Sequence, residues 1–434
     1  LFRVLDDLLD DWEDENIHLF DGIRVVGNRW SERSHDTKMF LARNHVHYQW
    51  LELERDADAT RLQALFGGSD HELPMVVLPD GTALHGASPR DLADALGLQT
   101  SVGSPNDLYD LVVIGAGPAG LAAAVYGASE GLRTAVIERD APGGQASQSS
   151  LIENYLGFPK GVSGADLSHR AVTQARRLGA EMVLARHVEA LEPRGRVHGV
   201  RFDDGTEIEA RAVVVATGCS YQLLEAPGLA ELTGRGVFYG AAAGDAPATN
   251  GEDVYIVGAA NSAGQAALNL AQHARRVVLL VRGDALEKSM SQYLVERILA
   301  TDNVEVRLQT EIGCGGGGDH LEWLVLANRS TGEQERVETN WLYVFIGASP
   351  RTDWLHDSIA RDTKGFVLTG PDIFEFDSEK HRWTLERQPM LLETSCPGVF
   401  AVGDVRRSSM KRVASAVGDG SCAVSLVHIY LETV

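Results

Sequence analysis

An apolar run at 109–114 is followed directly by the glycine-rich turn Gly115-Ala116-Gly117-Pro118-Ala119-Gly120. The run predicts a strand buried on both faces, and the alanine-rich stretch after the turn predicts a helix. A helix that begins at such a turn exposes backbone amides, which bind an anion with help from the helix dipole. The sequence therefore predicts a parallel α/β unit that binds a dinucleotide through its pyrophosphate.

Each glycine of this turn has a physical task. Gly115 forms the tight turn, Gly117 lets the backbone approach a pyrophosphate, and Gly120 lets the helix pack closely on the strand. Glu138 follows the next apolar run, about 20 residues on, where an acidic side chain accepts hydrogen bonds from a ribose diol. The acidic residue and the flanking strand and helix make this a specific fingerprint.

A second strand-to-helix turn follows the apolar run 254–257. Its string Gly258-Ala259-Ala260-Asn261-Ser262-Ala263-Gly264 keeps the first glycine but has Ala260 in place of the second. The added methyl group narrows the approach to a pyrophosphate. We therefore expect a second nucleotide-binding unit whose binding is weakened or shifted.

Length and charge limit the remaining choices. A chain of 434 residues is expected to form about three domains. The net charge of -22 repels a phosphate backbone, and no Lys/Arg cluster offsets it, so nucleic acid is not expected as a partner. Apolar runs such as 277–281 are far shorter than the ~20 residues of a membrane span, and the first residues do not resemble a secretory signal. We therefore expect a cytoplasmic protein that does not enter the membrane.

The N-terminal part reads as a separate unit. Residues 1–16 predict an acidic helix or linker, and 17–100 predict a small α/β domain. Within it we expect strands at 23–26, 48–53 and 75–78, with the first helix at 34–44. The polar stretch 101–107 predicts a linker, and the glycine run 313–318 predicts a flexible hairpin end.

Further strings resemble segments of the low-molecular-weight thioredoxin reductases. Pro142-Gly143-Gly144-Gln145 and 152–159 are similar to that family's flavin-contacting segments, and Ala216-Thr217-Gly218 is similar to its crossing between domains. The string 397–404 is similar to its second FAD motif. The resemblance implies an α/β fold with two Rossmann-like, three-layer ββα domains, preceded by a small thioredoxin-like domain. An FAD-binding domain at 108–222 and 350–434 would enclose an NAD(P)H-binding domain at 223–349.

The resemblance also implies site residues. The implied FAD contacts are Gly115, Gly117, Pro118, Ala119, Gly120, Glu138, Arg139, Gly144, Gln145, Asn154, Val188, Thr217, Gly218, Gly403, Asp404, Lys411, Arg412 and Val413. The implied NAD(P)H contacts are Gly258, Ala260, Asn261, Ser262, Ala263, Arg282 and Gly347. Asp404 would hold the ribityl chain. Arg282 alone remains of the arginines that grip a 2′-phosphate in that family, so the choice between NADPH and NADH stays open.

The cysteines depart from the family pattern. Alignment of 236–245 places Gly240 and Ala243 where the two redox cysteines belong, and neither can form a thiolate. The N-terminal domain resembles glutaredoxin, with a cis-proline expected at Leu73-Pro74, but Ser31 and Ser34 stand at its Cys-x-x-Cys positions. These serines either cap the following helix or mark a docking or regulatory module. The chain's cysteines, Cys219, Cys314, Cys396 and Cys422, are scattered and predict no metal site.

The pattern predicts an FAD-dependent NAD(P)H oxidoreductase that passes electrons from flavin to a non-disulfide acceptor, with no catalytic side chain assigned beyond the flavin. Two alternatives stay open: a flavin-dependent oxidase or tailoring enzyme that uses O2, and a non-catalytic redox or nucleotide sensor. A ferredoxin or flavodoxin acceptor ranks below a small molecule, because the acidic chain repels acidic carriers. The family resemblance implies a homodimer, and similar bacterial fusions imply a fused or docking regulatory domain.

Overall fold

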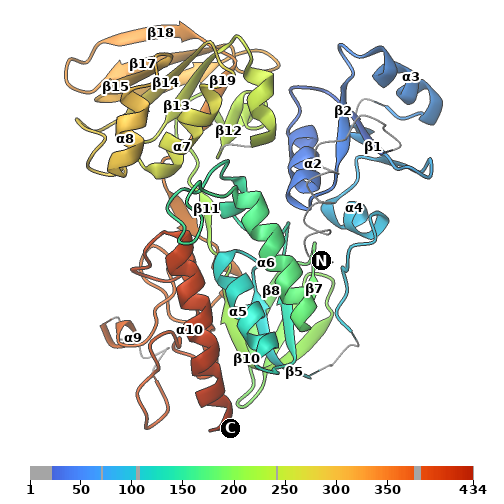
Figure 1. Ribbon diagram of the computed structural model, residues 1–434, viewed down its shortest axis with the longest axis vertical. Coiled ribbons are helices and arrows are strands. Elements are labelled where there is room, and N and C mark those ends of the chain that lie inside the picture. Colours follow the sequence, from blue (N-terminus) through green and yellow to red (C-terminus); the bar gives the residue numbers. More distant parts are fainter. Residues whose placement is uncertain (1–21, 70–71, 104–107, 241–242, 376–382, 434) are drawn as a thin grey trace.

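The computed structural model describes residues 22–69, 72–103, 108–240, 243–375 and 383–433. The predicted acidic segment 1–16 lies outside these residues. Figure 1 shows three units, with the N-terminal residues in blue beside two larger α/β bodies. The body drawn at the top is yellow to orange, and the body below it combines green segments with the red C-terminal helix.

The N-terminal unit contains β1 (Ile23–Gly27), α2 (Glu32–Arg43), β2 (Tyr48–Glu52), α3 (Ala57–Phe66), β3 (Met75–Val77), β4 (Ala83–His85) and α4 (Pro89–Ala95). Its sheet has the order β2-β1-β3-β4, with β1 and β2 parallel and the other pairs antiparallel. Helix α2 begins two residues earlier than predicted because the Ser31 hydroxyl oxygen accepts a hydrogen bond from the Ser34 N–H at 3.3 Å. The capping role expected for this pair thus belongs to Ser31. The Leu73-Pro74 peptide bond is cis, as predicted.

The first Rossmann-like unit is built around a seven-stranded sheet. Its elements are β5 (Leu108–Ile114), α5 (Pro118–Ser129), β6 (Thr134–Ile137), α6 (Gly164–Leu178), β7 (Glu181–Val183), β8 (Val188–Pro193), β9 (His198–Phe202), β10 (Glu207–Val215), α9 (Asp372–Glu375), β21 (Val399–Ala401) and α10 (Val413–Leu431). The order is β7-β6-β5-β10-β9-β8, and β21 pairs in parallel with the end of β10. Alternate residues of β5 face helices α5, α6 and α10 on one side and β8 and β9 on the other, which gives three layers.

The second Rossmann-like unit contains a five-stranded parallel sheet and a three-stranded antiparallel one. Its elements are β12 (Val237–Tyr239), β13 (Asp253–Val257), α7 (Asn261–Leu270), β14 (Arg276–Val281), α8 (Gln292–Leu299), β15 (Val304–Leu308), β16 (Thr310–Gly316), β17 (Trp323–Asn328), β18 (Gln334–Glu338) and β19 (Trp341–Val344). The parallel order is β12-β19-β13-β14-β15. A two-stranded ribbon, β11 (Cys219–Tyr221) with β20 (Ala348–Pro350), joins this unit to the first.

The glycine run 313–318 lies at the end of a β-hairpin, as predicted, but residues 313–316 form regular strand and not the flexible end that was expected. Strand β16 includes Gly313 to Gly316 and pairs with β17. A Cβ at Gly315 would lie 2.4 Å from a methyl carbon of Leu229, and one at Gly317 would lie 1.9 Å from the carbonyl oxygen of His320. These glycines permit close packing of the sheet, which overrides their intrinsic preference for irregular backbone.

Helix α10 alone among the described helices is long and apolar enough to cross a membrane. In this fold it packs along α5, and Ala423, Val424 and Val427 are buried in the core that the two helices share. A close approach makes this packing possible: a Cβ at Gly420 would lie 2.1 Å from the carbonyl oxygen of Ala119. The apolar composition of α10 therefore serves the interior of the first Rossmann-like unit.

Candidate functional site

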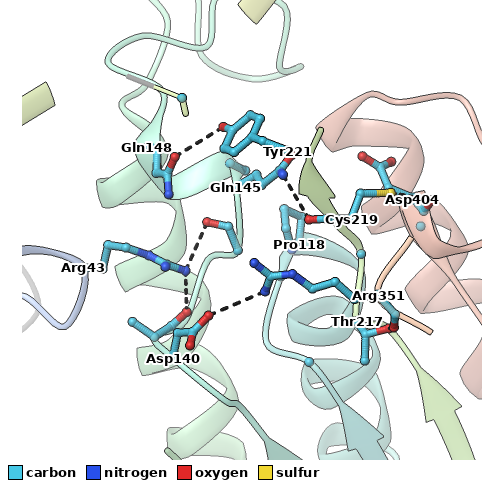
Figure 2. A pocket seen from close by; sticks show the side chains of 18 of the residues that line it. Arg43, Pro118, Asp140, Gln145, Gln148, Thr217, Cys219, Tyr221, Arg351 and Asp404 are labelled. Carbon is cyan, nitrogen blue, oxygen red and sulfur yellow. Dashed lines mark hydrogen bonds and ion pairs between the residues drawn. The ribbon is translucent and has the colours of Figure 1, made fainter. Parts of the chain in front are cut away.

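A cavity of about 660 Å³ lies where the three units meet. All the FAD candidates except Gly120 line it, and from the second turn Asn261 and Ser262 also reach it. The remaining nucleotide candidates, Gly258, Ala260, Ala263, Arg282 and Gly347, lie outside its lining. Figure 2 shows the cavity from close by.

The glycines of the first turn differ in what surrounds them. Gly115 has a φ of +103°, and a Cβ there would lie 2.5 Å from the carbonyl oxygen of Ala216. A Cβ at Gly120 would lie 1.9 Å from the carbonyl oxygen of Gly115, so α5 packs directly on the turn. At Gly117, the N-cap of α5, the nearest atom is the Cα of Gly144 at 4.0 Å. Gly115 and Gly120 thus shape the turn, while Gly117 keeps space open at the start of the helix.

Glu138 closes the base of the site. Its buried carboxylate accepts hydrogen bonds from the N–H groups of Ala116 at 2.7 Å and Asp140 at 3.0 Å. Burial raises the pKa of this carboxyl above its ordinary value. Two N–H donors leave further lone pairs on the carboxylate for a ligand hydroxyl.

A second turn, residues 141–144, faces the start of α5. Gly143 and Gly144 both have positive φ, and the Gly143 N–H donates to the carbonyl oxygen of Ala116 at 2.7 Å. The next residue, Gln145, donates from Nε2 to the carbonyl oxygen of Cys219 at 3.0 Å. These bonds connect the first Rossmann-like unit to the joining ribbon on the cavity wall (Figure 2).

The opposite wall carries a charged cluster. Burial raises the pKa of Asp404, and the nearby Lys411 opposes that rise. Lys411 Nζ lies 3.6 Å from Cys219 Sγ, and the Cys219 thiol donates to the carbonyl oxygen of Asp404 at 3.2 Å. Burial raises the pKa of the Cys219 thiol, although Lys411 favours the thiolate. The net effect keeps Cys219 protonated near neutral pH.

Cations gather around the cavity even though the chain has a net charge of -22. The cationic lining residues are Arg43, Arg139, Arg186, Arg351, Lys411 and Arg412, against the carboxylates Asp36, Glu138, Asp140 and Asp404. Arg351 lies 3.5 Å from Asp140 (Figure 2). This excess of positive charge and the open helix start at Gly117 fit the anionic pyrophosphate of FAD.

The cavity lining also contains residues that were not predicted from the sequence, and three of them shape its walls. Arg43 comes from the N-terminal unit, Arg351 follows β20, and Tyr221 ends β11. None belongs to a short motif, and each reaches the cavity only through the packing of separate units. The position of Arg351 next to the predicted domain boundary between residues 349 and 350 was the one local signal that could have revealed it.

The position predicted for the first redox cysteine is filled by a neighbour. Gly240 has a φ of +86°, and a Cβ there would lie 2.8 Å from three ring-end atoms of Tyr221. The Tyr221 hydroxyl lies 3.3 Å from Gln148 Oε1, and burial raises its pKa to about 12. The backbone of Ala243 lies in a 3₁₀ segment, Ala243–Thr249. The wall at this point is therefore a neutral phenol packed against a glycine.

The second turn keeps the backbone form of the first. Ala260, the N-cap of α7, has φ -95° and ψ 175°, close to the φ -72° and ψ -179° of Gly117. Gly258 has φ +149°, and a Cβ there would lie 2.7 Å from the carbonyl oxygen of Phe345. The Asn261 side chain bonds to both the N–H and the hydroxyl of Ser291. Only the methyl group of Ala260 distinguishes the two helix starts at this position.

Arg282 is exposed beyond the end of β14. Nearby, Asp284 forms an ion pair with Lys288 at 2.6 Å. Within the described ranges, no group of three or more His, Cys, Asp or Glu side chains is placed to hold a metal ion.

Two strand, glycine turn and helix units facing a shared, cation-lined cavity define a dinucleotide-binding oxidoreductase of the flavoprotein type. The chain belongs to the pyridine nucleotide-disulphide oxidoreductase family, whose model matches residues 109–420. This family membership implies that it binds FAD and NAD(P)H.

Within that family the chain is thioredoxin reductase-like. It is 32% identical over 332 residues to a thioredoxin reductase of Peptoclostridium acidaminophilum, covering 75% of this chain and 98% of the relative. It is 30% identical over 338 residues to a thioredoxin reductase of Bacillus subtilis, covering 76% and 96%. Among solved structures, a Lactococcus lactis thioredoxin reductase in its FR conformation matches with a TM-score of 0.67 and 28% identity, covering 75% of this chain and 100% of that one.

Proposed function

We propose that this protein is an FAD-dependent NAD(P)H oxidoreductase that does not exchange disulfides and passes electrons from the flavin directly to a non-disulfide acceptor. The observation that carries this proposal is the Tyr221 ring against Gly240. Disulfide exchange needs an attacking thiolate and a second thiol in reach. At Gly240 neither the residue nor the space beside it can supply one.

The other cysteines support this proposal. Cys219 lines the cavity, but burial holds its thiol pKa above the ordinary value. Burial raises the pKa of Cys396 to about 12, Cys422 is exposed on α10, and Cys314 lies in β16. No two of them are joined in a disulfide. A nucleophilic thiol pair is therefore not expected to form at the flavin.

The residues present fit FAD. In our proposal the pyrophosphate lies at the start of α5 beside Gly117, Glu138 accepts from the adenosine ribose, and Asp404 accepts from the ribityl chain. All three residues line the same cavity. When bound, FAD would accept a hydride equivalent from NAD(P)H and hand electrons to the acceptor. The protein's own contribution is to orient the cofactor and to exclude water from the wall formed by Tyr221 and Phe345.

NAD(P)H would dock at the turn before α7. The extended backbone at Ala260 supports docking, while its methyl group predicts lower affinity than a glycine would give. Arg282 is exposed and would favour a 2′-phosphate, whereas Asp284 two residues on would repel one. We therefore propose that either nucleotide is accepted.

We also propose the domain division 17–100, 108–222 with 350–434, and 223–349, with the first being thioredoxin-like and without cysteines. The mixed sheet and the cis-proline support that resemblance. A homodimer and a cytoplasmic location complete the proposal. A sensor is the second candidate function, because α2 of the N-terminal unit lines the cofactor cavity and could transmit its state.

Anaerobic stopped-flow absorbance tests the main proposal. The purified holoprotein is mixed with NADPH or NADH, and the flavin band is followed. Rapid bleaching by either nucleotide, with no reduction of a thioredoxin or of an aromatic disulfide reagent, is expected. Bleaching by neither nucleotide would overturn the reductase and favour the sensor or oxidase, and disulfide turnover would overturn the claim that exchange is lost.

A further inference from the structure

The cofactor cavity has a wall that the matched family region does not supply. The family model matches residues 109–420, yet the cavity is also lined by His35, Asp36, Met39, Phe40 and Arg43 of helix α2. Helix α2 thus extends the site beyond the two Rossmann-like units. In Figure 2 the Arg43 side chain points toward the backbone next to Asp140, and Arg351 contacts the Asp140 carboxylate from the other side.

Arg43 is the last residue of α2, and it is tied to the turn that faces the start of α5. Its Nη2 donates to the carbonyl oxygen of Ala141 at 3.0 Å and to that of Gly144 at 3.4 Å. A Cβ at Gly144 would lie only 3.2 Å from the Cα of Gly117. The turn 141–144 therefore lies between the Arg43 guanidinium and the start of α5, where a pyrophosphate would bind.

Arg43 forms no direct ion pair among the described residues, although its charge favours the ionised forms of Asp140 and Glu138. Its Nε is buried and has no hydrogen-bond partner in the described part of the chain, while its Nη2 bonds only to neutral carbonyls. A buried cationic donor without an acceptor is costly. An anion bound within reach of Arg43 would offset that cost by adding an acceptor.

The opposite end of α2 is anchored on the second Rossmann-like unit. Trp30 stacks on His320 with ring centroids 4.7 Å apart, and His35 contacts Phe238 at 5.0 Å. Arg29 donates from Nη2 to the carbonyl oxygen of Ala248 at 2.9 Å. Contacts at both ends hold α2 between the two Rossmann-like units, so the position of Arg43 does not depend on its own side-chain hydrogen bonds alone.

We infer that Arg43 is an FAD-binding residue supplied by the N-terminal unit: held by the carbonyls of Ala141 and Gly144, it adds a fixed positive charge for the diphosphate. FAD affinity then depends on a domain outside the matched family region. This inference rests on the proposed function, because it requires the cavity to bind FAD.

The test is FAD titration of apoprotein followed by quenching of flavin fluorescence. Arg43→Gln is expected to raise the Kd about tenfold, which is about 1.4 kcal/mol. Arg43→Lys, which keeps the charge, is expected to recover most of the affinity, whereas a purely structural role in α2 would give no such rescue. The matched control is Arg33→Gln on the same helix, whose Nη2 donates to the carbonyl oxygen of Gly86 within the N-terminal unit. It is expected to change the Kd less than twofold.

An unchanged Kd in Arg43→Gln, an equal loss in Arg33→Gln, or an Arg43→Lys variant as weak as Arg43→Gln would each overturn the inference. If wild type itself does not bind FAD, the proposed function fails instead, so the two failures are distinguishable. Should Arg43→Gln not fold, hydrogen exchange of wild type decides the matter. FAD is expected to slow exchange in 40–46, and protection confined to residues beyond 108 would overturn the inference.

Discussion

Two glycines of the first turn are expected to respond differently to replacement by alanine: Gly120→Ala should reduce stability, and Gly117→Ala should reduce FAD affinity. In Gly120→Ala the new Cβ would meet the carbonyl oxygen of Gly115 at 1.9 Å, so backbone must move by more than an ångström. In Gly117→Ala no atom lies closer than the Cα of Gly144 at 4.0 Å, and φ of -72° suits alanine. Gly120→Ala is therefore expected to destabilise the fold, whereas Gly117→Ala is expected only to reduce the space available to a ligand.

The magnitudes follow from these contacts. Overpacking costs about 1–3 kcal/mol and more where backbone must shift, and alanine in a helix regains about 0.5–1 kcal/mol. Gly120→Ala should thus lose about 2 kcal/mol of unfolding free energy. Gly117→Ala should change the unfolding free energy by less than about 1 kcal/mol, because the lost freedom of the unfolded chain is offset by the preference for glycine over alanine at an N-cap. Its FAD affinity should fall at least about tenfold, since charge-assisted hydrogen bonds contribute about 1.5–3 kcal/mol.

Urea unfolding of both apoproteins measures the first quantity, and FAD fluorescence titration measures the second. Gly131→Ala serves as a control, because nothing lies within 4 Å of its Cβ position and it is remote from the cavity lining, although its φ of +86° adds a small cost. If Gly120→Ala unfolds like wild type, or if Gly117→Ala binds FAD like wild type, the roles assigned to these glycines are wrong.

Three further outcomes are expected. Burial lowers the pKa of His198 from 6.5 to about 4. As the pH falls, the unfolded chain therefore binds a proton at this histidine before the folded chain does. The free energy of unfolding is expected to be highest above pH ~6.5 and to fall by about 3 kcal/mol toward pH ~4. Urea unfolding against pH measures this, and a slope that persists in His198→Leu would refute the assignment. Ala260→Gly should tighten NAD(P)H binding several-fold in a titration of the flavin absorbance, and unchanged binding would show that the methyl group is no obstacle. Gly240→Cys should lose about 1–3 kcal/mol in thermal unfolding; a companion Tyr221→Ala that restores no stability would contradict the clash with that ring.

The features that could be predicted from the sequence are those that depend on a few adjacent residues. The glycine spacing at 115–120 reflects needs of a few adjacent residues, so the strand, turn and helix could be predicted together. The same holds for the cis bond at Leu73-Pro74 and for strands β1 to β3, whose bounds differ from prediction by a residue. Where a local preference met tertiary packing, the prediction failed in part: residues 313–316 lie in β16, where Leu229 leaves no room for a side chain at Gly315.

The cation cluster and the filled cysteine position needed the tertiary structure. Arg43 and Gly144 are 101 residues apart in the chain, and their hydrogen bond exists only because α2 packs across the joint between the two larger units. Tyr221 ends β11 and Gly240 follows β12, so their contact arises only when the ribbon and the second Rossmann-like unit pack together. The sequence by itself determined two strand, glycine turn and helix units, and it predicted that they bind dinucleotides and that Gly240 and Ala243 replace the redox cysteines, since both predictions depend on residue identity at fixed spacing. Which distant charges share the cavity was decided by packing between units, because side chains far apart in sequence carry no local signal of their contact.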